Sequence, residues 1–146
     1  QVLTPGRILV LETNGIQYEY HTSLNGDVIQ PATLALTWSR EGRIAGFCDH
    51  LVVFISGEVY ASNCRSEPRE TGGNFSELLS AVEQRQFTAW YLEYGESTLD
   101  QSDPAGVSDR MTNTLAFFGS GSSQPPKADQ QALLDWPTAL FKKLNS

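Results

Sequence analysis

The 146-residue sequence has few basic side chains and no long hydrophobic run, and each scarcity excludes a class of partner. Its ten lysines and arginines stand singly apart from Lys142 and Lys143, so no basic stripe is available to neutralise nucleic-acid phosphates. The formal net charge of −7 also disfavours adsorption to anionic lipid. No apolar run approaches the roughly eighteen residues of a membrane-spanning helix. We therefore expect neither nucleic-acid binding nor a transmembrane segment in this acidic chain.

Known catalytic and cofactor-binding motifs are missing as well. The glycine- and serine-rich run at 119–123 lacks the lysine and the spacing of a phosphate-binding loop, and is predicted to be a flexible linker. The spacing of the two cysteines matches neither CxxC redox chemistry nor a four-ligand zinc site, which needs more Cys or His ligands than this pair supplies. The sequence therefore predicts no catalytic residue, no cofactor and no metal ligand.

The nearest approach to a nucleophilic site is the pair Asp49 and His50, with Ser56 and Ser62 close along the chain. Adjacent residues of a regular strand point to opposite faces, so Asp49 could not orient His50 as the carboxylate of a catalytic triad does. The other histidine is His21, and a metal site that used both His21 and His50 would need at least one further ligand, which the sequence does not identify. Both histidines are expected to be ordinary strand residues.

The acidic segment 100–109 is the nearest approach to a calcium site, because it carries Asp100, Asp103 and Asp109. Its spacing differs from the EF-hand loop, in which a glycine stands sixth and a glutamate twelfth. Asp-Pro and glycine are turn formers, and they favour a plain connection between a helix and a strand. Calcium binding stays open as the alternative.

The two cysteines, Cys48 and Cys64, bracket a predicted β-hairpin around Ser56 and Gly57. Residues that lie opposite each other in an antiparallel pair have position numbers with a constant sum, which is 112 for these cysteines. The same sum leaves residues 55–57 as a three-residue loop whose last position, Gly57, requires the left-handed region. We therefore predict a Cys48–Cys64 disulfide, which closes a loop of about fifteen residues and contributes about 3 kcal/mol.

The first half of the chain is predicted to be rich in hairpins. Residues 7–13 and 16–22 flank Asn14-Gly15, the strongest short hairpin signal, and residues 33–40, 43–54 and 58–64 continue a meander. A further strand is expected at 110–119.

Two helices are predicted in the second half. Ser80 and Glu83 form a capping box, and Gly95 ends the helix that they begin. The last helix runs from about Pro126 through a kink at Pro137. Aromatic residues follow one sector of the first helix, which favours packing on a sheet over a stacking platform for a ligand: Phe87, Trp90, Tyr91 and Tyr94. The predicted fold is a single α+β domain over residues 1–146, with an antiparallel sheet of about six strands covered by two helices.

A disulfide implies an oxidising compartment, and the chain begins at Gln1 without an initiator methionine, as a processed chain does. We therefore expect an extracytoplasmic protein, secreted, periplasmic or lipid-anchored. The absence of catalytic motifs favours a non-enzymatic module that binds a protein, a peptide or a cell-envelope ligand. Two alternatives stay open: a small secreted hydrolase, and a protease inhibitor that presents the hairpin loop at 55–58.

Overall fold

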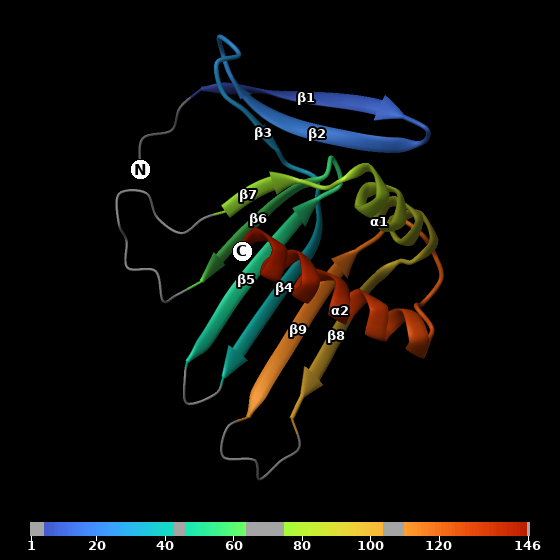
Figure 1. Ribbon diagram of the computed structural model, residues 1–146. Coiled ribbons are helices and arrows are strands. Elements are labelled where there is room, and N and C mark those ends of the chain that lie inside the picture. Colours follow the sequence, from blue (N-terminus) through green and yellow to red (C-terminus); the bar gives the residue numbers. More distant parts are fainter. Residues whose placement is uncertain (1–4, 43–45, 64–74, 104–109, 146) are drawn as a thin grey trace.

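The computed structural model describes residues 5–42, 46–63, 75–103 and 110–145, and confirms the α+β class (Figure 1). A three-stranded sheet has the order β1-β2-β3, and a six-stranded sheet has the order β7-β6-β5-β4-β9-β8. Every pair of neighbouring strands within the two sheets is antiparallel. The strands are β1 (Gly6–Thr13), β2 (Ile16–Ser23), β3 (Ile29–Pro31), β4 (Leu34–Gly42), β5 (Phe47–Phe54), β6 (Glu58–Asn63), β7 (Phe75–Leu78), β8 (Glu96–Ser102) and β9 (Met111–Phe118). The helices are α1 (Ala81–Glu93) and α2 (Lys127–Leu144).

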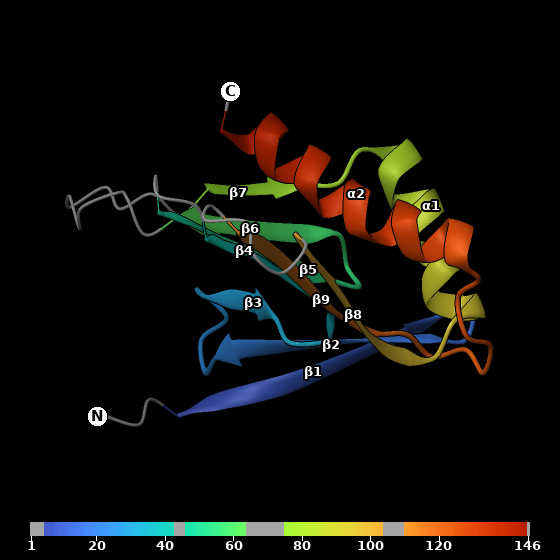
Figure 2. The same ribbon diagram turned by 90° about the horizontal axis from the view of Figure 1, so that it is seen from below.

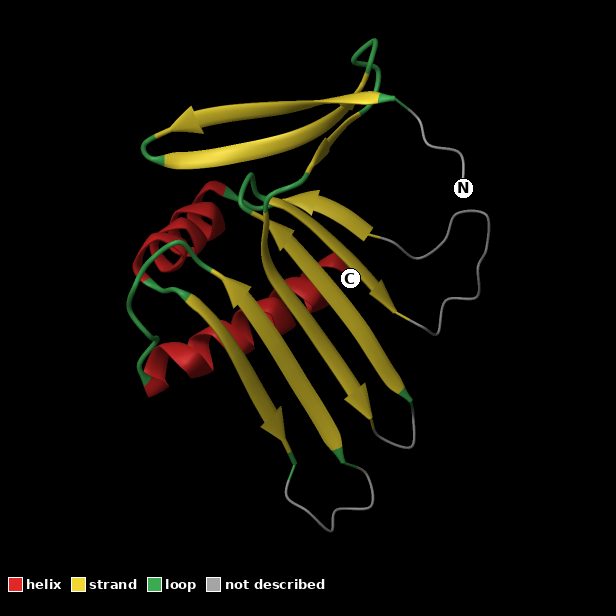
Figure 3. Cartoon of the chain, turned by 180° about the vertical axis from the view of Figure 1, so that it is seen from behind, coloured by secondary structure: helices red, strands yellow, loops and turns green. Residues whose placement is uncertain are grey.

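The sequence placed the first hairpin in the main sheet, whereas in the structure β1 and β2 join β3 in a sheet of their own. Three strands were not predicted: β3, β7 and β8. Both helices lie on one face of the six-stranded sheet, and the small sheet lies on the opposite side, toward one end of the strands (Figure 2). The outer face of the six-stranded sheet therefore has no helix over it (Figure 3).

The core lies between the six-stranded sheet and the two helices. Alternation along the strands directs every second side chain into it. The aromatic sector of α1 is part of this core, as predicted: Phe87 is buried and stacks on Trp136 of α2, with ring centroids 5.2 Å apart. Trp90 meets the same indole edge to face at 5.9 Å. α2 continues through Pro137 as one helix.

The β5–β6 hairpin has the predicted register. Asp49 pairs with Asn63, and Val53 pairs with Val59. In both pairs the two position numbers add up to 112, the predicted sum. Gly57 has φ +98°, the left-handed conformation that the three-residue loop requires. The first hairpin also follows its sequence signal, because Asn14 and Gly15 both have positive φ, as a two-residue turn demands.

The glycine- and serine-rich run at 119–123 is not a flexible linker, so this prediction is wrong. The backbone N–H groups of Ser120 and Gly121 donate to the carbonyl oxygens of Tyr91 and Tyr94, at 2.8 and 3.0 Å. These bonds satisfy acceptors at the end of α1 that the helix itself leaves free. A Cβ on Gly121 would lie 2.2 Å from the backbone of Glu93, so glycine allows the loop to lie directly against the helix end.

The capping box of α1 yields a first prediction. Glu83 N–H donates to Ser80 Oγ at 3.3 Å, and Ser80 N–H donates to Glu83 Oε2 at 2.7 Å. We expect Ser80→Ala to lower the free energy of unfolding by about 0.5–2 kcal/mol in urea titrations. Ser122→Ala, at an exposed loop position, is the control and should change the free energy of unfolding by less than about 0.5 kcal/mol.

The contribution of this capping box to the stability of the fold should depend on pH. Partial burial alone would raise the pKa of the Glu83 carboxyl, but hydrogen bonds from Ser80 and the charge of Lys143 outweigh it and lower the pKa below its ordinary value of 4.5. A lowered pKa in the folded state stabilises the fold above the unfolded pKa, and this contribution disappears as the pH falls through the folded pKa. The difference in the free energy of unfolding between wild type and Ser80→Ala should therefore become smaller as the pH falls. A difference that stays constant between about pH 6 and pH 3 would contradict the assignment.

Candidate functional site

Asp49 and His50 lie on opposite faces of β5, as their adjacency predicted. Asp49 is 7% exposed on the core face, where its Oδ2 accepts a hydrogen bond from Arg40 Nε at 2.9 Å. His50 is exposed on the outer face, opposite Ser39 of β4 and Ser62 of β6. The buried carboxylate thus pairs with a guanidinium and does not orient the imidazole.

Cys48 also lies on β5, and it is not a free thiol. Its Sγ is 3.8 Å from His50 Nε2. Its predicted partner, Cys64, lies outside the described residues, so the Cys48–Cys64 disulfide stays a prediction. The β5–β6 register supports this disulfide, because the position numbers of paired residues add up to 112, as 48 and 64 do.

The hairpin loop at 55–58 packs against its neighbours. Ile55 is buried, its carbonyl oxygen accepts from Gln84 Nε2 at 3.1 Å, and its N–H donates to the Thr33 carbonyl oxygen at 3.0 Å. The Gly57 carbonyl oxygen accepts from Leu79 N–H at 2.9 Å. An inhibitor loop must offer its backbone to a protease, whereas this backbone is already engaged. The geometry favours a structural turn.

Of the acidic segment at 100–109, the structure describes residues 100–103. Asp103 Oδ2 accepts from Met111 N–H at 3.0 Å, and Asp103 N–H donates to the Met111 carbonyl oxygen at 3.0 Å. These bonds use the carboxylate locally, as a turn does. The prediction that this segment connects a helix to a strand is wrong, because residues 100–102 belong to β8, which pairs with β9. Within the described ranges, no group of three or more His, Cys, Asp or Glu side chains is arranged to hold a metal ion.

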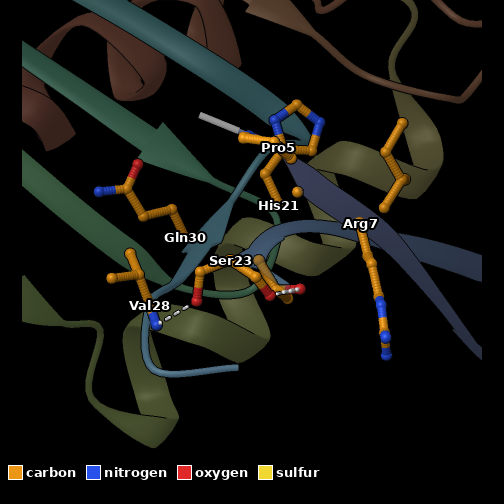
Figure 4. Close-up of a pocket in the computed structure, with 9 residues that line it drawn as sticks. Pro5, Arg7, His21, Ser23, Val28 and Gln30 are labelled. Atoms are coloured by element: carbon orange, nitrogen blue, oxygen red, sulfur yellow. Dashed lines mark hydrogen bonds between the residues drawn. The ribbon is translucent and has the colours of Figure 1, made fainter. Parts of the chain in front are cut away.

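A hollow lies at the open end of the β1–β2 hairpin (Figure 4). It has a volume of about 490 Å³ and is lined by the start of β1, the end of β2 and the turn that leads to β3. Ser23 holds this turn, because its Oγ accepts from Val28 N–H at 3.1 Å. His21 and Arg7 stand on neighbouring strands with their charged or polar ends pointing in different directions. The hollow is open to solvent, and both polar and apolar residues line it.

A second hollow has a volume of about 300 Å³ and shares one lining residue, Gln30, with the first. Its other walls are apolar: Pro31 of β3 together with Val52, Phe54 and Tyr60 on the outer face of the six-stranded sheet. The rings of Phe54 and Tyr60 meet edge to face at 5.8 Å. We refer to these two hollows, which share Gln30, as the groove; aromatic rings line only the second hollow.

The sequence analysis missed one constellation on β2, of which His21 and Ser23 line the first hollow. Glu19, His21 and Ser23 occupy alternate positions of β2 and so share a face, and His21 Nε2 lies 3.0 Å from Glu19 Oε1. The period-two spacing could have revealed them. Their geometry is not that of a triad, because Ser23 Oγ is engaged by Val28 N–H and both His21 and Glu19 are largely exposed.

No family model, curated protein or solved structure matches this chain. Neither helix in the described part of the chain has the length and apolar character needed to cross a membrane.

Proposed function

We propose that the protein is a non-enzymatic, extracytoplasmic binding module whose ligand lies in the groove around Gln30. The observation that carries this proposal is that Gln30 lines both hollows, each of which has the size of a small-molecule or peptide subsite. Together they offer an aromatic floor and several hydrogen-bonding groups, which is the usual composition of a recognition site.

The candidate ligand is an extended polar chain with apolar surfaces, such as a peptide or a cell-envelope glycan. Tyr60 is 40% exposed and its ring is braced by Phe54, so it can pack on a ligand and lose little conformational entropy. At the other end Gln30, His21 and Arg7 can exchange hydrogen bonds with it. Arg7 makes no ion pair with a described residue and is available for an acidic group.

The extracytoplasmic location rests on the predicted disulfide, and the β5–β6 register supports it. The hydrolase alternative has the Glu19–His21 contact in its favour. It lacks an activated nucleophile, because His21 has no hydrogen bond to a described serine. The binding function therefore fits the groove better.

The test is a titration of ¹⁵N-labelled protein with two sets of probes, short peptides and soluble cell-wall glycan fragments. We expect amide shifts to concentrate around Gln30 and Tyr60. Tyr60→Ala should weaken binding by about tenfold or more, as loss of an aromatic anchor does. Phe118→Ala removes an exposed aromatic ring from β9, outside the groove, and should leave the affinity unchanged.

Two results would contradict the proposal. One is the absence of shifts around the groove with every probe. The other is an equal loss of affinity in Tyr60→Ala and Phe118→Ala. Turnover of a probe that His21→Ala abolishes would favour the hydrolase instead.

A further inference from the structure

β1 combines an edge position with the side-chain pattern of a buried strand. It has four consecutive aliphatic residues, and all are exposed: Ile8 67%, Leu9 43%, Val10 51% and Leu11 50%. A continuous aliphatic run is typical of strands that are covered on both faces. β1 is instead the outermost strand of the small sheet, paired on one side only (Figures 1 and 2).

The other three described sheet edges are protected. β3 has three residues and ends with Pro31, β7 has four residues and carries Glu77, and β8 carries Glu96 and Asp100. Short length, proline and charge are the usual protection against pairing with another chain. β1 has eight residues, and its two charged residues, Arg7 and Glu12, flank the aliphatic run without interrupting it. Among these edges, β1 alone is long, aliphatic and open.

The backbone of β1 is also ready for a partner. Thr13 and Ile16 close the two-residue turn, so they form a hydrogen-bonded pair, and such pairs alternate with non-bonded ones along the ladder. The N–H and C=O groups of Ile8, Val10 and Glu12 are therefore directed away from β2. A strand added at this edge would meet three donors and three acceptors in a row.

We propose that a second copy of this chain occupies the edge, with the two β1 strands antiparallel about a two-fold axis at Leu9. A two-fold axis perpendicular to the sheet brings residues of equal parity opposite each other, so Ile8 meets Val10 of the second copy. Both of these residues direct their free backbone groups outward, as a hydrogen-bonded pair requires. The two sheets become one six-stranded sheet with aliphatic residues at its centre on both faces.

A second copy can occupy this edge in the antiparallel direction without placing like charges opposite each other, and Arg7 and Glu12 point to opposite faces of the joined sheet. Antiparallel pairing sets the Arg7 end of one strand beside the Glu12 end of the other, whereas parallel pairing would set like charges together. In the register about Leu9, Arg7 faces Leu11 and Glu12 faces Gly6, so no like charges oppose each other. Gly6 lines the groove, so Glu12 of the second copy would lie at its rim. The pairing goes beyond the proposed ligand site and does not depend on it.

Sedimentation equilibrium from about 10 μM to about 1 mM tests the pairing. We expect the weight-average mass to rise from 16.1 kDa toward twice that value. Val10→Pro removes one outward N–H without removing a bond to β2, and should weaken dimerisation by about tenfold or more. Val10→Lys keeps the N–H but places a charge among the aliphatic residues, and should have the same effect.

Val82→Pro is the matched control. Val82 is another exposed valine, 65% exposed, and lies in the first turn of α1, where proline is tolerated. It should dimerise like wild type, and far-UV circular dichroism should show that all three variants are folded. A wild-type chain that stays monomeric throughout would overturn the inference. So would undiminished dimerisation of Val10→Pro and Val10→Lys.

Discussion

Replacing Phe117 with alanine is expected to lower the free energy of unfolding by about 3–5 kcal/mol. Phe117 is 1% exposed, and its ring meets that of Phe87 edge to face at 6.2 Å. Alanine would leave a cavity between β9 and α1, and the surrounding rings can fill it only in part. Because domains of this size are stable by only about 5–15 kcal/mol, urea titration should show a much lower midpoint.

The adjacent residue provides the control. Phe118 is 36% exposed and points to the other face of β9. Phe118→Ala should therefore lower the free energy of unfolding by less than about 1 kcal/mol. The same chemical change at consecutive positions therefore tests which face of β9 is covered. Equal losses in the two variants would mean that the helices do not cover the face assigned here.

The second large effect is expected for Asp49→Asn. This change removes the charge of a buried carboxylate and leaves the Arg40 guanidinium, whose side chain is 15% exposed, without its counter-ion. Breaking a buried pair in this way costs about 3–5 kcal/mol, because the remaining charge is desolvated and uncompensated. The nearby rings of Phe47 and Trp38, 4.9 and 5.7 Å from the guanidinium carbon, cannot replace a carboxylate.

An exposed ion pair serves as the comparison. Glu77 lies 3.5 Å from Lys143, and both side chains are nearly half exposed. Glu77→Ala should change the free energy of unfolding by only about 0–1 kcal/mol. The double change Arg40→Met with Asp49→Leu should recover most of the loss of Asp49→Asn, since a buried pair replaced by apolar side chains is often neutral. No recovery would assign the loss to packing and not to the unpaired charge.

Local chemistry made part of this fold predictable. Asn14-Gly15 specified a turn, Gly57 and the constant sum specified a register, and Ser80 with Glu83 specified where α1 begins. Each of these signals acts within a few residues of the structure that it determines.

Other parts depend on long-range contacts and had no such signal. β8 reads ESTLDQS, which is polar in most positions, and it is a strand because β9 pairs with it. The loop at 119–123 is hydrogen-bonded to the end of α1, which lies about thirty residues earlier in the chain.

The candidate site was even less accessible to sequence analysis. The groove joins Gln30 and Pro31 to Phe54 and Tyr60, which meet only because the small sheet lies against the outer face of the large one. Asp49 and His50 were correctly separated by strand alternation. The edge position of β1 could not be predicted from the sequence, because an aliphatic run does not indicate whether the strand is covered or exposed to solvent.

The position of β4 at the centre of its sheet has a consequence for how the chain folds. β4 pairs with β5, its neighbour in sequence, and with β9, where residues 36–42 meet residues 111–117. The meander from β4 to β6 can close through short loops, whereas the β4–β9 ladder must wait for a loop closure across about half of the chain. Until β9 and α2 arrive, Leu36 and Trp38 on β4 have neither a neighbouring strand on that side nor the helix above them. We therefore expect the core to form only after β9 pairs with β4 and α2 covers the sheet.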